Sequence, residues 1–182
     1  MRRTITLLFT LLIAILIGSS SVTAAESLTV NFGNVSGGVH FVQGTPTPNC
    51  TVNADGSVTC PELAFELAGV GNKNAVATLV VTYSATVDCY NPGVNPQNPI
   101  ESHTESQSTS ASSGLLEPKN GRLTILPITS DPDPTEETFE ALASCPNPNW
   151  TPDVLDGSIT FTYEYKVTFV GFSAPVILIT GP

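Results

Sequence analysis

The sequence predicts an all-β protein: a two-sheet antiparallel β-sandwich, immunoglobulin-like in architecture, with at most one short helix. Two long segments alternate apolar and polar residues with a period of two, which is typical of half-buried strands. Clusters of Gly, Pro and Asn separate these segments from several shorter ones. A β-barrel is the alternative architecture for the same set of strands.

The two long segments are 75–89 and 159–169, and we expect both to be central strands of a sheet. In the first of them, Leu79 and Val81 belong to the apolar set and Thr82 to the polar set. Shorter strands are expected, in chain order, at 27–32, 39–42, 50–53, 57–67, 122–129 and 175–180.

Two other segments have different patterns. Residues 101–113 are nearly all polar, so neither face of this segment can lie in a core. It is expected to be an exposed edge strand, to which a partner strand could add, or a mobile loop. Only 133–143 is expected to be helical, with Asp133 as N-cap and Pro134 at the first helical position. Its apolar stripe is expected to consist of Phe139, Leu142 and Ala143.

The N-terminus has the pattern of a cleavable signal peptide. Two arginines precede an apolar run over 5–17, and small residues follow the run. The run is shorter than the roughly 18 residues that usually span a bilayer. We therefore expect residues 1–25 to be removed on export. This leaves 26–182 as a single disulfide-bonded domain that is secreted, extracellular and not an integral membrane protein.

The expected secreted chain is strongly acidic. Residues 1–25 hold two of the six basic residues and none of the 16 acidic ones, so their removal leaves a net charge of −12. The remaining cations are Lys73, Lys119, Arg122 and Lys166. A surface of this charge repels phosphate backbones, so nucleic acid is not an expected partner.

Four cysteines predict two disulfides in an exported chain, and they are Cys50, Cys60, Cys89 and Cys145. We expect 54–56 to be a three-residue hairpin loop with Gly56 in the left-handed conformation. In that register Cys50 lies opposite Cys60 at a non-hydrogen-bonded site, where Cα atoms are about 4.5 Å apart. This pairing leaves Cys89 to bond with Cys145.

The sequence offers little for catalysis. It has two histidines, His40 and His103, and no Gly-x-Ser-x-Gly motif for a nucleophilic serine. The acids that could form a glycosidase pair are interpreted as solvated, and they are Glu62, Glu66, Asp153 and Asp156. The stretch from Asp131 to Glu140 has oxygen ligands but not the spacing of a calcium loop, so calcium binding there stays an open alternative. We predict no catalytic residue, no cofactor and no defined set of metal ligands.

Two loops rich in proline and asparagine form a candidate binding patch. One loop follows Cys89 and the other follows Cys145, so a disulfide between these cysteines brings both loops to one region. Prolines limit the entropy lost on binding, and the amides and aromatic rings suit sugars or peptides. The candidate residues are Tyr90, Asn91, Asn95, Asn147, Asn149 and Trp150. The alternative places both rings in the core, with the tryptophan packed over the disulfide.

Five segments form a recognisable set, and they are 39–42, 66–72, 89–93, 119–121 and 145–151. The last of them, Cys-Pro-Asn-Pro-Asn-Trp-Thr, is the most specific. Together they resemble a group of secreted bacterial four-cysteine proteins that have no assigned function. The resemblance implies an exported four-cysteine β-sandwich, and it implies no activity and no functional residue.

These expectations favour a non-enzymatic extracellular protein that binds or has a structural role, with an unknown extracellular protein or glycan as its partner. A secreted hydrolase acting on glycans and a secreted protease inhibitor are the alternatives. A histidine beside a serine and a carboxylate would favour the hydrolase, and a protruding rigid loop would favour the inhibitor.

Overall fold

Strand β6 (Ala75–Tyr90) is a central strand of the largest sheet, and its side chains are buried alternately. Every odd-numbered side chain from Ala75 to Cys89 is buried, which defines an inner face of the sheet. The computed structural model describes residues 26–35, 37–93 and 99–182, and the predicted signal peptide lies outside them. Within these residues the prediction of an all-β sandwich is confirmed, with antiparallel sheets and one short α-helix.

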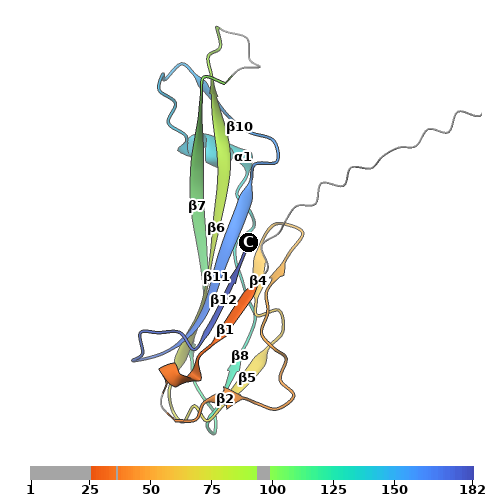
Figure 1. Ribbon diagram of the computed structural model, residues 1–182, viewed down its shortest axis with the longest axis vertical. Coiled ribbons are helices and arrows are strands. Elements are labelled where there is room, and N and C mark those ends of the chain that lie inside the picture. The colour runs from red at the N-terminus through yellow and green to blue at the C-terminus, as the bar shows by residue number, and fades with distance from the viewer. Residues whose placement is uncertain (1–25, 36, 94–98) are drawn as a thin grey trace, which may run out of the picture.

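The large sheet has six strands. The strands that join β6 are β7 (Glu101–Leu116), β10 (Thr151–Val154), β11 (Thr160–Phe169), β12 (Ile177–Gly181) and β1 (Ser27–Val30). One edge of β6 pairs with β7, and the other edge pairs first with β11 and then with β10 (Figure 1). Strands β12 and β1 continue the sheet beyond β11. The two long predicted strands are therefore central, as expected.

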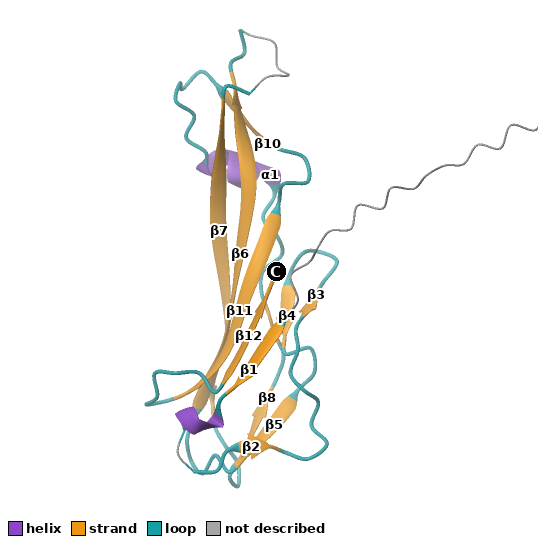
Figure 2. Cartoon of the chain, viewed as in Figure 1, coloured by secondary structure: helices purple, strands orange, loops and turns teal. Residues whose placement is uncertain are grey.

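Two three-stranded sheets form the second layer (Figure 2). The first contains β2 (His40–Phe41), β5 (Phe65–Ala68) and β8 (Arg122–Ile125), and the second contains β3 (Thr51–Val52), β4 (Val58–Cys60) and β9 (Ile128–Thr129). One hydrophobic cluster joins all three sheets and includes Leu79, Leu67 and Val58. None of the sheets closes on itself in the described residues, so the closed alternative is not formed.

Prolines interrupt two predicted strands. The strand predicted at 57–67 is divided into β4 and β5 by a break that begins at Pro61, and the strand predicted at 122–129 is divided into β8 and β9 around Pro127. Proline has no backbone N–H for a sheet ladder, which explains both breaks. Strand β10 was not predicted because it contains Pro152. An edge position tolerates this proline.

Helix α1 (Glu136–Leu142) is shorter than the sequence predicts. The prediction of Asp133 as N-cap is wrong, and Thr135 is the cap. The Asp133 N–H donates to the Asp55 carbonyl oxygen at 3.2 Å, so this residue packs on the hairpin loop instead of starting the helix. Phe139 is fully buried, as expected, but Leu142 is 48% exposed and does not belong to the buried stripe, because the helix ends at this residue. No helix in the described part of the chain has both the length and the apolar character to cross a membrane.

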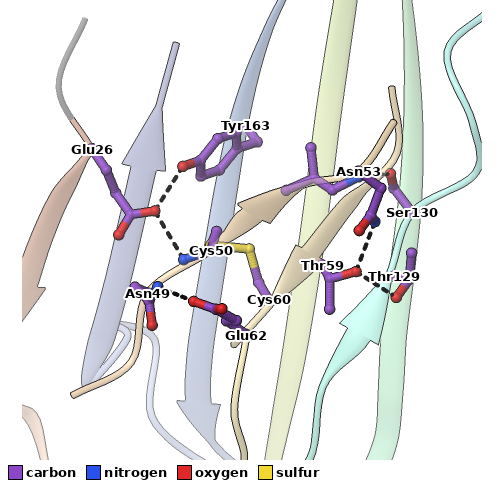
Figure 3. Close-up of a disulfide and its surroundings, with 11 residues drawn as sticks. Glu26, Asn49, Cys50, Asn53, Thr59, Cys60, Glu62, Thr129, Ser130 and Tyr163 are labelled. Atoms are coloured by element: carbon purple, nitrogen blue, oxygen red, sulfur yellow. Dashed lines mark hydrogen bonds between the residues drawn. A yellow bond between two sulfur atoms is a disulfide. The ribbon is translucent and has the colours of Figure 1, made fainter. Parts of the chain in front are cut away.

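The hairpin at Gly56 has the predicted register. Gly56 has a φ of +76°, and the Asn53 N–H donates to the Ser57 carbonyl oxygen at 2.8 Å. Cys50 and Cys60 therefore lie opposite each other, with Cα atoms 4.6 Å apart, and form a disulfide (Figure 3). This pairing is confirmed.

The second disulfide joins Cys89, which is buried in β6, to Cys145 in the segment after α1. The predicted pairing is confirmed here too. Two disulfides in a chain of this size are typical of extracellular proteins.

Glu26 ties the large sheet to the hairpin. Its carboxylate accepts a hydrogen bond from the Cys50 backbone N–H at 2.9 Å and one from the Tyr163 hydroxyl at 2.7 Å (Figure 3). Burial of the ring, together with this carboxylate, raises the pKa of Tyr163 far above its ordinary value. Burial has the same effect on the pKa of Tyr165.

We expect loss of the Cys89–Cys145 disulfide to destabilise the protein more than loss of Cys50–Cys60. The bonded cysteines are 56 and 10 residues apart in sequence, respectively. Loop-closure entropy then predicts a stabilisation of about 4 kcal/mol from Cys89–Cys145 and about 3 kcal/mol from Cys50–Cys60. Urea unfolding of the two paired Cys→Ala variants, followed by circular dichroism, measures both losses. A larger loss from the Cys50/Cys60 pair would contradict the expectation.

We also expect the tyrosines of the folded protein to stay protonated at pH 10. Burial is the first cause of a raised pKa at all four, which are Tyr83, Tyr90, Tyr163 and Tyr165. Unfolded tyrosines ionise near pH 10. The stabilisation from these protons is therefore complete below about pH 10 and is lost as the pH rises through the folded-state pKa values. Phenolate absorbance of folded and urea-unfolded protein measures the difference, and a half-ionised tyrosine in folded protein at pH 10 would disprove it.

Candidate functional site

The two predicted loops meet at one end of the large sheet, which is uppermost in Figure 2. Strand β10 pairs with the end of β6, so Thr151 lies opposite Tyr90. Trp150 directly precedes β10. The Cys89–Cys145 disulfide attaches the start of the Trp150 loop to the same end of β6. Both aromatic residues are therefore carried by segments that the sheet and the disulfide hold together.

A hollow of about 440 Å³ opens beside Tyr90, and we call it the tyrosine hollow. Its lining consists of Tyr90, Asn91, Pro92, Glu140, Thr151, Pro152 and Asp153. The carboxylates come from two elements, because Glu140 belongs to α1 and Asp153 to β10. A ring next to amide, hydroxyl and carboxylate groups can hold an amphipathic ligand by its apolar face and its polar edge.

A second hollow of about 310 Å³ opens beside Trp150, and we call it the tryptophan hollow. Its lining consists of Ala143, Ser144, Cys145, Asn147, Pro148, Trp150 and Pro152. Because Pro152 lines both hollows, they are neighbours. Trp150 and Tyr90 are half-buried, and neither ring is part of the hydrophobic core. The alternative that places them in the core is therefore not what the chain forms.

Side-chain amides fix one turn in each loop, at 91–93 and at 147–150. The Oδ1 atom of Asn91 accepts from the Gly93 N–H at 3.0 Å, and Oδ1 of Asn147 accepts from the Asn149 N–H at 3.0 Å. The Asn147 carbonyl oxygen also accepts from the Trp150 N–H at 2.9 Å. These intramolecular hydrogen bonds restrict the two turns, so less conformational entropy is lost when a ligand binds.

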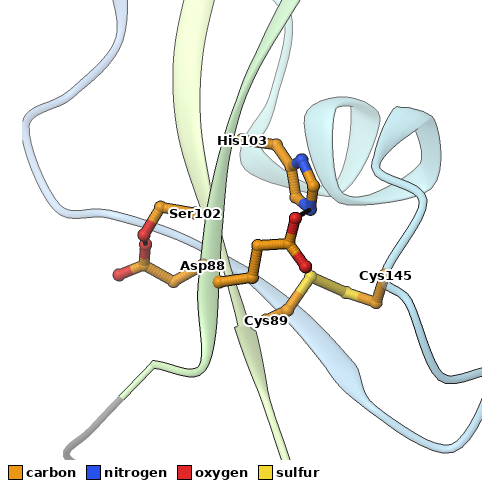
Figure 4. Close-up of polar contacts among 6 residues, drawn as sticks. Asp88, Cys89, Ser102, His103 and Cys145 are labelled. Carbon is orange, nitrogen blue, oxygen red and sulfur yellow. Dashed lines mark hydrogen bonds and ion pairs between the residues drawn. A yellow bond between two sulfur atoms is a disulfide. The ribbon is translucent and has the colours of Figure 1, made fainter.

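Asp88 supports Tyr90 from the neighbouring outward position of β6. Its carboxylate is 6% exposed and accepts from the Ser102 hydroxyl at 2.5 Å (Figure 4) and from the Tyr90 hydroxyl at 3.4 Å. Loss of surrounding water and the charges of Asp88 and Asp153 raise the pKa of Tyr90. The phenol therefore remains a neutral hydrogen-bond donor at the edge of the tyrosine hollow.

The structure places the predicted patch residues unequally. Four of the six line the two hollows: Tyr90, Asn91, Asn147 and Trp150. Asn149 is exposed and lines neither hollow, and Asn95 lies outside the described residues. The predicted patch did not include Glu140, Thr151 and Asp153, and Asp153 was considered only as a candidate glycosidase acid. Only the pairing of β10 with β6 and the packing of α1 bring them to the site, and no local pattern signals either.

Neither histidine completes a nucleophilic site in the described residues. Ser102 and His103 are adjacent in β7 and point to opposite faces (Figure 4). Ser102 bonds to Asp88, whereas Nε2 of His103 lies 3.6 Å from a Glu101 carboxylate oxygen. The His40 ring contacts a backbone carbonyl oxygen. The described residues also contain no group of three or more His, Cys, Asp or Glu that could hold a metal ion.

Comparison with known proteins gives no match. No family model matches the chain, and neither a curated protein nor a solved structure matches it at a significant level. The resemblance to secreted bacterial four-cysteine proteins therefore stays a prediction. The residues of the two hollows are the remaining guide to function.

We expect Trp150→Ala to change stability little, because the ring lies outside the core. The free energy of unfolding should fall by no more than about 1 kcal/mol, as for other substitutions away from the core. The matched control is Phe139→Ala on nearby α1. Its ring is fully buried and its loss should cost about 3 to 5 kcal/mol. Urea unfolding followed by far-ultraviolet circular dichroism tests both variants. A fall of about 3 kcal/mol in the free energy of unfolding of Trp150→Ala would show that the ring belongs to the core.

Proposed function

We propose that the protein is a non-enzymatic extracellular binding protein that recognises a glycan through the tyrosine and tryptophan hollows. The position of its only tryptophan is the main support. Large aromatic side chains contribute most to stability when they are buried in a core. Here Trp150 and Tyr90 both line hollows outside the core, next to each other across Pro152.

The chemistry of the hollows favours a glycan over a protein partner. Each hollow combines one aromatic ring with at least one asparagine, and the tyrosine hollow adds two carboxylates and a threonine. A sugar presents apolar C–H groups to a ring and hydroxyl donors to amide and carboxylate oxygens. Hollows of about 440 and 310 Å³ also fall near the size of small-ligand sites, whereas a protein partner usually covers a broad surface.

The scaffold supports the same conclusion. The Cys89–Cys145 disulfide and the two asparagine turns restrict the described parts of both loops, which lowers the entropy lost on binding. The disulfides also suit an oxidising extracellular compartment, where many glycans are found.

Binding to immobilised polysaccharides and to a glycan array tests the proposal. We expect the wild-type protein to be retained by at least one glycan class, and Trp150→Ala and Tyr90→Ala to weaken that retention roughly tenfold or more. Leu126→Ala is the matched control, because this side chain is 59% exposed and lies outside both hollows. Retention equal to wild type in the Trp150 variant, or binding to no glycan, would rule out the proposal.

A glycan hydrolase is the second candidate, and one observation favours it. Glu140 and Asp153 line the same hollow, and glycosidases use two carboxylates. Release of new reducing ends from a bound glycan, abolished by Glu140→Gln or Asp153→Asn, would replace the binding role with this activity.

A further inference from the structure

Strand β7 leaves a long edge of the large sheet open. It is 16 residues long and pairs with β6 along one side. Among the described strands, none pairs with its other side (Figure 1). Unpaired backbone N–H and C=O groups along such an edge can pair with another strand, and proteins usually block them with proline, lysine, a bulge or a short strand.

The middle of this edge has no block of that kind. Residues 106–113 include no proline and no charged residue. The bulge between β6 and β7 lies at the far end of the stretch, next to Gly114, whose φ is +67°. The charged glutamates of the strand, Glu101 and Glu105, lie at the near end. An uncharged, regular edge therefore lies between the glutamates and the bulge.

We propose that this edge pairs with the same edge of a second copy of the chain, with the two β7 strands antiparallel about a two-fold axis near Ser108. Such self-complementary pairing is the usual geometry of a homodimer, and addition of a strand to a sheet edge is a recurring way to join chains. The proposal is independent of the glycan-binding role.

The charges of the strand favour this arrangement. In an antiparallel pair centred on Ser108, Glu105 of each copy lies opposite Ala111 of the other. Glu101 lies outside the uncharged stretch 106–113. In a parallel pair each glutamate would instead lie beside its own counterpart and repel it. The whole chain carries a net charge of −10, so an uncharged edge is where two copies can approach most easily.

The hydroxyl side chains of β7 are complementary to themselves. On the outer face, the Ser108 hydroxyl already lies 2.8 Å from that of Thr82 on β6, and the hydroxyls of Ser106 and Ser84 are also 2.8 Å apart. In the proposed pair, Ser108 lies opposite Ser108 and Ser106 opposite Ser110. The same hydroxyl contacts can therefore continue from β6 through β7 into the second copy.

The expected association is weak. Pairing along roughly eight residues buries less surface than a standard stable interface, so a dissociation constant in the micromolar range or weaker is expected. Sedimentation equilibrium of the purified protein over a wide concentration range measures it. We expect a monomer–dimer equilibrium, and a protein that stays monomeric at millimolar concentration would overturn the proposal.

A charged residue at the axis tests where the copies meet. Ser108→Lys brings two lysines together and should weaken dimerisation at least tenfold. The matched control is Thr162→Lys. Thr162 is exposed on the same face of the large sheet as Ser108, and both residues pair with Thr82, but Thr162 belongs to β11 and lies away from the β7 edge. If Ser108→Lys and Thr162→Lys weakened dimerisation equally, the copies would associate through the outer face of the large sheet. That result would overturn pairing through the β7 edge.

Variants of opposite charge at Ser108 distinguish loss of the dimer contact from damage to the fold. Ser108→Lys and Ser108→Glu should each be mostly monomeric, with melting temperatures close to that of wild type, because this side chain is exposed. A mixture of the two should form a heterodimer at least as readily as wild type forms its homodimer. Failure of the mixture to associate, with both variants folded, would exclude an axis at Ser108.

Discussion

The pairing of β6 with three other strands determines most of this structure. Its inner side chains form the centre of the core, and its two edges carry β7 on one side and β11 followed by β10 on the other. The strand also ends in Cys89 and Tyr90, so the element that organises the core delivers the first aromatic residue of the candidate site. The end of β6 that carries Tyr90 is held in place by its pairing with β10 and by the Cys89–Cys145 disulfide.

The second layer depends on this large sheet. Its strands have two to four residues each, too few to form stable sheets alone. Long-range contacts compensate for their length. The Cys50–Cys60 disulfide closes the hairpin, Glu26 bonds to its backbone, and the Tyr83 hydroxyl of β6 donates to the Gly56 carbonyl oxygen at 3.1 Å. The last two contacts join the hairpin to a residue of the large sheet or to one next to it.

Local patterns were enough to predict the features that depend on local geometry. Alternation identified β6 and β11, and counting from Gly56 gave the Cys50–Cys60 pairing, because a hairpin register follows from its loop length. The breaks at Pro61 and Pro127 were missed although proline signals them locally, because it has no backbone N–H for a sheet ladder. Strand β10 and the start of α1 were missed because each depends on which strand or loop lies nearby. The same limit applies to the site: a cysteine pairing placed Tyr90 and Trp150 together, but nothing near Glu140 in sequence signals its place beside Tyr90.

The two proposed surfaces are geometrically compatible. The hollows lie at the end of the large sheet where β7 begins, because Glu101 pairs with Cys89, whereas the proposed axis near Ser108 lies well along the strand. An antiparallel dimer would therefore leave both pairs of hollows uncovered and place them at opposite ends of one continuous sheet. Two sites on one rigid body can bind a repeating polymer more tightly than either site alone, provided that the polymer spans them. A weak dimer and a weak glycan site would then reinforce each other. When two copies of the protein bind the same polymer, their β7 edges are held close together, which raises the local concentration for dimerisation.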